Sequence, residues 1–248
     1  MKTLLMKLLL AILILAVALT AVAQNRLPNK PYTEWSLQEV TQLLYSSEWT
    51  QISSKSGQSK YYAGTPDTPP PTSFFVQLRL HSALPVRQAI VRRMQLTIPY
   101  AKLTDAQRAS FDSEVEGLLK CPQCAEYYIV TLISSQGDRL SLATRGSAVR
   151  LDTVETLKSV PEDELLQHMW LANDKGERRN AARVVFTSKH EVIVLFRRLD
   201  EHRNPLITPT NKKFTVEFDN FISKKTEEAL KKFTFKVSDI VRNGEVLF

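Results

Sequence analysis

The sequence predicts an α+β protein in which a mainly antiparallel sheet packs with about three to four amphipathic helices. Helical periodicity is concentrated in the first half of the chain, where apolar residues recur at spacings of three and four. Alternation of apolar and polar residues is concentrated in the second half. Helices weighted early and strands weighted late along one chain are typical of the α+β class.

The chain begins with the three parts of a cleavable export signal. Two lysines accompany an unbroken apolar run from Leu8 to Leu19, and the small residues Ala21-Val22-Ala23 follow before Gln24. This run is shorter than the roughly 20 residues that span a bilayer, so cleavage is expected rather than an anchor helix. The sequence therefore predicts a soluble exported protein, periplasmic or extracellular, with no membrane anchor after cleavage.

The expected division of the chain has three parts. Residues 1–23 form the signal peptide, residues 24–73 an N-terminal helix and a loop, and residues 74–248 a single α+β domain. The loop is placed from Ser53 to Ser73 because this stretch is rich in Ser, Gly and Pro.

The charge distribution does not indicate a nucleic-acid partner. The 33 basic residues outnumber the 26 acidic ones, but the basic residues occur as separate doublets with acids close by. A nucleic-acid binder usually concentrates its positive charge on one face. No nucleic acid is therefore expected as a partner.

The first helix is expected from Leu37 to Ser46. Ser36 and Glu39 have the spacing of a capping box, in which each side chain bonds to the other residue's backbone N–H. Trp35 and Val40 stand at the two positions of a hydrophobic staple, which fixes how the chain enters the helix.

Between residues 74 and 134 the pattern alternates between strand and helix. The expected elements are a strand at Phe74–His81, a helix that begins near Pro85, a helix from Thr104 to just before Pro122, and a strand at Glu126–Ser134. Thr104 and Gln107 form a second capping box, and Arg87 is placed on the polar side of the preceding helix.

The rest of the chain is expected to be rich in strands. A helix begins at Pro161 and Glu162 and is expected to continue through Met169 and Trp170. The strands that follow are a hairpin of Ala182–Thr187 with Glu191–Leu199, then Phe214–Phe218, Phe233–Val237 and a short end at Glu245–Phe248.

Cys121 and Cys124 are the only two cysteines of the chain. They suit a structural disulfide, free thiols, a redox-active dithiol or metal binding. A redox pair normally lies at a helix N-terminus, whereas here a helix is expected before the motif and a strand after it. A disulfide is the favoured state, and no metal is expected because no histidine spacing supplies further ligands.

Two groups of polar residues are weaker candidates for a site. Asp200, Glu201 and His202 place acids and an imidazole together on an expected loop, which suits acid–base chemistry or a solvated turn. Arg79 and Arg87 suit the binding of an anionic ligand or a solvated helix face. The chain lacks nucleophile elbows, phosphate-binding loops and calcium loops, so no catalytic residue and no cofactor is expected.

Three stretches carry a resemblance to a known family. They are Tyr32 to Val40 with Leu44 and Trp49, then Ser82 to Ala89, and finally Val241 to Glu245. On these residues the chain resembles a family of uncharacterised exported bacterial proteins of acidobacterial type, with the motifs W-[ST]-x-x-E-V-x-x-L-L and S-A-x-P-V-R-x-A. Glu48 and Leu80 depart from the family pattern, which has proline and tryptophan there. The resemblance implies export and a shared fold, and it implies no activity, ligand or catalytic residue.

The function expected from these observations is binding. Because each catalytic motif considered is missing, the sequence favours a non-catalytic exported protein that acts through an unknown protein or small-molecule partner. The alternative is an enzyme of the cell envelope. It would be a hydrolase that uses Asp200, Glu201 and His202, or a thiol-disulfide redox protein that uses Cys121 and Cys124.

Overall fold

The computed structural model describes residues 27–57, 72–135, 153–187, 191–226 and 229–248. The predicted signal peptide, residues 1–23, lies outside the described residues, as does the stretch 58–71.

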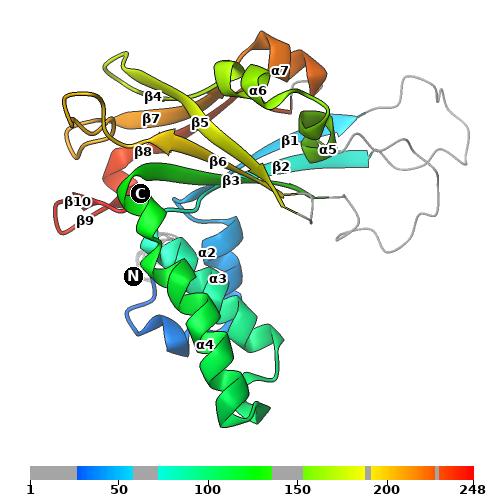
Figure 1. The fold of residues 1–248 in the computed structure, drawn as a ribbon, viewed down its shortest axis with the longest axis vertical. Helices are drawn as coiled ribbons and strands as arrows, with labels where there is room; N and C mark the ends of the chain where they lie inside the picture. The colour runs from blue at the N-terminus through cyan, green and yellow to red at the C-terminus, as the bar shows by residue number, and fades with distance from the viewer. Residues whose placement is uncertain (1–26, 58–71, 136–152, 188–190, 227–228) are drawn as a thin grey trace, which may run out of the picture.

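A large antiparallel sheet forms the centre of the fold (Figure 1). The strands found in the described ranges are β1 (Thr50–Gly57), β2 (Thr72–Leu80), β3 (Tyr127–Ser135), β4 (Met169–Asn173), β5 (Arg178–Phe186), β6 (Glu191–Arg197), β7 (Lys213–Phe218) and β8 (Lys232–Lys236). Their order across the sheet is β1-β2-β3-β6-β5-β4-β7-β8, and each neighbouring pair is antiparallel. The end strands β1 and β8 contact each other, so the sheet is strongly curved. A separate small hairpin joins β9 (Val241–Arg242) to β10 (Glu245–Val246).

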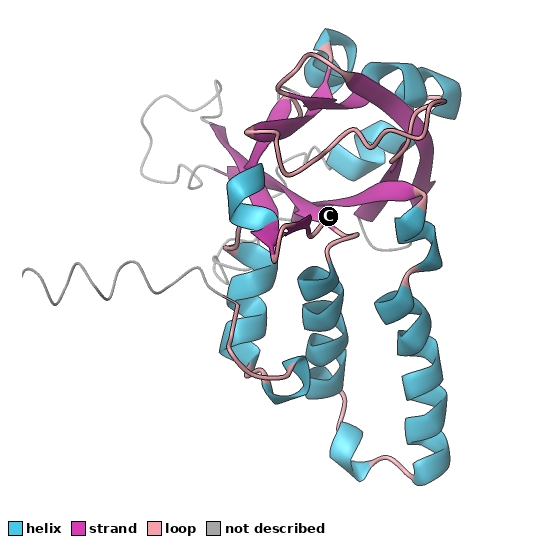
Figure 2. Ribbon diagram, turned by 90° about the vertical axis from the view of Figure 1, so that its left-hand side faces the viewer, coloured by secondary structure: helices cyan, strands magenta, loops and turns pink. Residues whose placement is uncertain are grey.

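Helices lie on both sides of this sheet (Figure 1). The helices of the described residues are α2 (Leu37–Tyr45), α3 (Leu84–Thr97), α4 (Asp105–Lys120), α5 (Thr153–Lys158), α6 (Glu162–His168), α7 (Asn220–Lys225) and α8 (Val237–Ile240). α2, α3 and α4 pack together on one side, and the long helices extend well away from the sheet (Figure 2). Within the described ranges, no helix has the length and apolar character needed to cross a membrane.

The alternation of β2 separates two different environments. Val76 and Leu78 point into the apolar core on one face of the sheet and are fully buried. Gln77 and Arg79 point to the other face, where both side chains donate to the backbone carbonyl of Leu44 at the end of α2. The layer between the sheet and α2–α4 therefore contains buried polar side chains.

The part of the apolar core that is formed by the C-terminal strands and by Phe248 is largely aromatic. The ring of Phe214 stacks on the rings of Phe235 and Phe248, with centroids 5.1 Å apart in each case. Arg198 lies over the ring of Tyr128 and donates to the carbonyl of Phe248. These contacts hold the last residue of the chain against β7 and β8.

The structure confirms the α+β class, the antiparallel sheet and both capping boxes. The side chains of Ser36 and Glu39, and those of Thr104 and Gln107, bond reciprocally to backbone N–H groups. α4 ends at Lys120, just before Pro122, as proline requires. β5 and β6 pair as the predicted hairpin, with its turn at residues 188–190 outside the described residues.

The prediction of a loop from Ser53 to Ser73 is wrong at both ends. β1 extends to Gly57, and β2 begins at Thr72. The two strands pair from Thr50 to Gly57 and from Thr72 to Arg79. The backbone hydrogen bonds between them therefore outweigh the low strand propensity of this segment's amino acids. β1, which lies in the part predicted as helix and loop, therefore belongs to the same sheet as β2 and β3.

Two further predictions are corrected. The helix that was expected to continue through Met169 and Trp170 ends at His168. These two residues begin β4 instead, because β4 forms backbone hydrogen bonds with β5 and β7. Arg87 is not on a solvated face of α3 but is 7% exposed. The short helices α5, α7 and α8 were not predicted.

Candidate functional site

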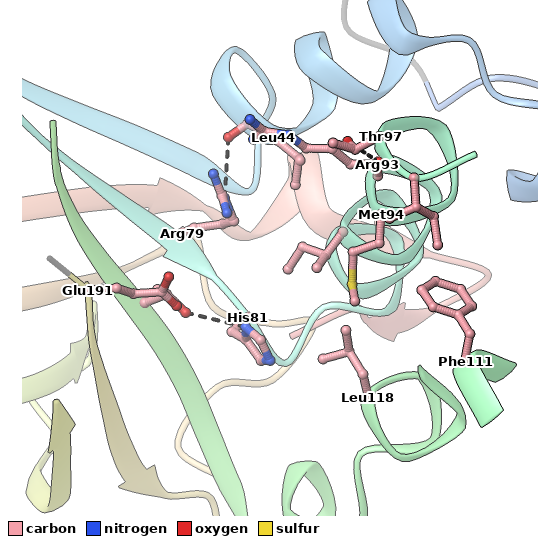
Figure 3. A pocket seen from close by; sticks show the side chains of 12 residues that line it. Leu44, Arg79, His81, Arg93, Met94, Thr97, Phe111, Leu118 and Glu191 are labelled. Atoms are coloured by element: carbon pink, nitrogen blue, oxygen red, sulfur yellow. Dashed lines mark hydrogen bonds between the residues drawn. The ribbon is translucent and has the colours of Figure 1, made fainter. Parts of the chain in front are cut away.

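A pocket of about 590 Å³ lies between α3, α4 and the sheet (Figure 3). Its apolar lining comes mostly from the helices: Leu44, Ile90, Met94, Ile98, Phe111 and Leu118. Its polar lining comes from the strands and the residue after β2 (Arg79, His81, Thr131 and Glu191) and from α3 (Arg93 and Thr97). Ligand sites are typically concave, of several hundred Å³, and apolar with a few convergent polar groups, which matches this pocket.

The apolar wall of the pocket is formed by residues at helical spacing on α3 and α4. Ile90, Met94 and Ile98 recur at intervals of four along and just beyond α3, so they share one face of that helix. Phe111 and Leu118 are two turns apart on α4 and face them. Met94 is 39% exposed, so the pocket opens to solvent beside this residue. The pocket thus has an apolar mouth between the two long helices.

Residues in or next to three neighbouring strands, β2, β3 and β6, form the polar end of the pocket. Arg79 on β2 is paired with Thr131 on β3, and β6 carries Glu191 at its first position beside β3. His81 follows the last residue of β2, and its Nδ1 lies 3.3 Å from the Thr131 hydroxyl oxygen. These residues are far apart in sequence, and strand pairing alone brings them together.

Arg79 is held rigidly at this end. Its Nε donates to the carbonyl of Leu44 over 3.3 Å, and one terminal nitrogen donates to the side-chain oxygen of Gln77 over 3.1 Å. The Leu44 carbonyl belongs to the last turn of α2, where the helix dipole favours a positive charge. Burial lowers the pKa of Arg79, while Tyr45 and Glu191 act in the opposite direction.

Burial also shifts the pKa values of two neighbouring groups, His81 and Glu191. Burial, together with the positive charges of Arg87 and Arg79, lowers the pKa of His81 to about 4. His81 is therefore a neutral imidazole at neutral pH, able to donate from one nitrogen and accept at the other. Burial raises the pKa of Glu191, and Arg79 opposes that shift.

Arg87 lies behind the pocket and joins three structural elements. One terminal nitrogen donates to the carbonyls of Leu118 and Leu119 in the last turn of α4, and the other donates to the carbonyl of Ser82. The guanidinium therefore connects α3 to the end of α4 and to the turn after β2. The anion-binding role expected for Arg79 and Arg87 stays a prediction, and of the two only Arg79 lines the pocket.

The loop of Asp200, Glu201 and His202 is a turn on the surface away from this pocket. One Asp200 carboxylate oxygen accepts from the backbone N–H groups of His202 and Asn204, at 2.9 and 2.8 Å. The bond from Asn204 is the main cause that lowers the pKa of Asp200. Glu201 and His202 are exposed. The geometry assigns Asp200 the turn-forming role that the sequence offered as its alternative.

Cys121 and Cys124 form a disulfide, with Cα atoms 5.3 Å apart. The bond closes a short turn between the end of α4 and the start of β3. The cysteines thus follow a helix C-terminus, as the sequence predicts, rather than preceding a long helix that would stabilise a thiolate. No group of three or more metal-ligating side chains occurs within the described ranges.

Replacing Cys124 with serine should lower the free energy of unfolding by about 1–2 kcal/mol, because cross-linking a loop this short restricts the unfolded chain only modestly. Urea denaturation of the parent and the Cys124→Ser variant, with and without reductant, measures the difference. Reductant should lower the parent to the level of the variant. A variant as stable as the oxidised parent would contradict a stabilising role.

Comparisons of the chain with models of protein families, with curated proteins and with solved structures found no match. The pocket is therefore the feature of the described residues that bears most directly on function. The sequence did not indicate Thr131 or Glu191 as site residues. The available signal was polar residues in strands otherwise rich in Val, Ile and Leu, but such residues are equally common on solvated faces.

Proposed function

We propose that this chain is an exported, non-catalytic binding protein that holds a small, largely apolar molecule between α3, α4 and the sheet. The observation that carries the proposal is the pocket of about 590 Å³ with apolar helical walls and a polar end on the sheet. Burial of an apolar ligand between these walls supplies the affinity, and the polar end supplies orientation.

Binding is favoured over the enzyme alternatives by the state of the candidate catalytic groups. The carboxylate of Asp200 is engaged in its own turn, and Glu201 and His202 are exposed beside it. Cys121 and Cys124 lie at the C-terminal end of α4, where a helix dipole does not favour a thiolate. Neither group lines the pocket.

Export is part of this proposal because the N-terminal sequence has the lysines, the apolar run and the small residues of a signal peptide. Cleavage before Gln24 would release the protein into the periplasm or the medium without a membrane anchor. There the partner is a small molecule rather than a nucleic acid, in keeping with the intermixed charges of the chain.

The neutral fluorescent probe N-phenyl-1-naphthylamine tests the pocket. The probe should bind with enhanced fluorescence, and Leu118→Glu should weaken its binding at least tenfold, because a carboxylate would then stand in the apolar wall. Ser113→Glu adds the same charge to an exposed position of α4 and should leave binding within twofold. Equal affinities of both variants and the parent, or no binding by the parent, would refute the proposal.

A further inference from the structure

We infer that the molecule held in the pocket carries an anionic head group, a carboxylate, placed beside Arg79 and Arg93. This inference rests on the proposed function and specifies the chemistry of its ligand. The ligand class is an amphiphilic monocarboxylate, with its apolar part between α3 and α4 and its charge toward the sheet.

The guanidinium groups of Arg79 and Arg93 both contact the Tyr45 ring. The central carbons of Arg79 and Arg93 each lie 5.7 Å from the centre of the Tyr45 ring, so the two charges are at most about 11 Å apart. Arg93 also donates to the Tyr45 hydroxyl over 2.8 Å. Each arginine is thus fixed by neutral partners, which position its charge without cancelling it.

The acids of the protein do not balance these charges. Among the described residues that line the pocket, Glu191 is the one acid, and it interacts electrostatically with Arg79. Within the described ranges, no acid forms an ion pair with Arg79 or Arg93. The described lining residues thus bring two cations and one carboxylate, which gives them a net positive charge. One added anion would neutralise it and would relieve the repulsion between the arginines.

The remaining polar groups suit the oxygens of a carboxylate. Thr131 can donate its hydroxyl proton to Nδ1 of His81, which leaves the proton of the neutral ring on Nε2. Nε2–H is then a donor for an acceptor-only head group. Charge-assisted hydrogen bonds from Arg93 to such a group are shorter and stronger than neutral ones. The wall formed by Ile90, Met94 and Leu118 offers no charged group to a cationic or zwitterionic head.

Competition against N-phenyl-1-naphthylamine at pH 8 tests the head group. Dodecanoate, dodecanol and dodecyltrimethylammonium share one alkyl chain and differ in charge. Dodecanoate should bind at least tenfold more tightly than dodecanol, and the cation should bind most weakly. Arg93→Gln should weaken dodecanoate about tenfold and leave dodecanol within twofold. Lys102→Gln removes an equal charge from an exposed position outside the pocket lining and should change neither.

The outcomes separate this inference from the proposed function. If the neutral probe binds in the pocket but dodecanoate and dodecanol bind equally, the binding function stands and the anionic head group is refuted. Preference for the cation, or an equal loss of acid and alcohol affinity in Arg93→Gln, refutes it as well. If the probe does not bind, or does not respond to Leu118→Glu, the proposed function fails first and the inference with it.

Discussion

Arg87→Met should lower the free energy of unfolding by about 3 kcal/mol or more. The guanidinium of Arg87 donates to the carbonyls of Leu118, Leu119 and Ser82, and methionine would leave these acceptors without a donor. An unsatisfied buried polar group costs roughly 1–3 kcal/mol, although the carbonyls at the end of α4 can recover part of this from water. Urea denaturation at neutral pH measures the change.

Two further variants make this measurement specific. Arg87→Lys keeps a positive charge but cannot present the planar fork, so an intermediate loss is expected. Lys120→Met also replaces a basic side chain with methionine, at an exposed position at the end of α4, and should stay within about 0.5 kcal/mol of the parent. A loss below 1 kcal/mol in Arg87→Met would show that Arg87 does not hold α4 in place.

The second large effect is a loss of stability in acid that depends on His81. Its pKa in the folded protein is about 4, below the ordinary value of 6.5, so the unfolded chain takes up the proton first. The contribution of His81 to stability is therefore complete above about pH 6.5 and is lost as the pH falls toward 4. A shift of this size corresponds to about 2–3 kcal/mol after allowance for partial solvation.

The difference between the parent and His81→Gln isolates this contribution. The parent should lose about 2–3 kcal/mol more than the variant between pH 7 and pH 4, because glutamine does not titrate. Glu191, whose pKa burial raises, acts in the opposite direction but is present in both proteins. His202→Gln, at an exposed position, is the control and should follow the parent. Parallel pH profiles of the parent and His81→Gln would contradict the neutral state of His81.

A fixed neutral His81 also bears on the proposed ligand. Since the imidazole is uncharged at neutral pH, the positive charge that the described lining residues bring to the pocket comes from Arg79 and Arg93. Arginine side chains in general keep their positive charge at any pH at which proteins are folded. Binding of a carboxylate ligand is therefore expected to depend on ionisation of the ligand rather than on ionisation of His81 near neutral pH.

Local sequence signals predicted the elements that depend on a few adjacent residues. The capping boxes at Ser36 and Thr104 are local hydrogen-bond patterns, so both helix starts could be predicted to within a residue. Proline at position 122 determined where α4 ends. The alternation in β8 reflects burial of one face and could likewise be recognised without the rest of the fold. β7 alternates in the same way, although its Thr215 is also buried.

Other features of the fold depend on how the strands and helices are arranged and could not be predicted from local sequence signals. The serine-rich segment of β1 is a strand because β2 supplies its hydrogen bonds, and Met169 lies in a strand because β5 and β7 flank it. Arg87 is buried because α4 presents its last carbonyls to it. The polar end of the pocket joins Arg79, Thr131 and Glu191 from β2, β3 and β6, which lie in three separate parts of the chain. Such contacts depend on strand order and on helix packing, and these follow from the free energy of the whole fold rather than from any one segment.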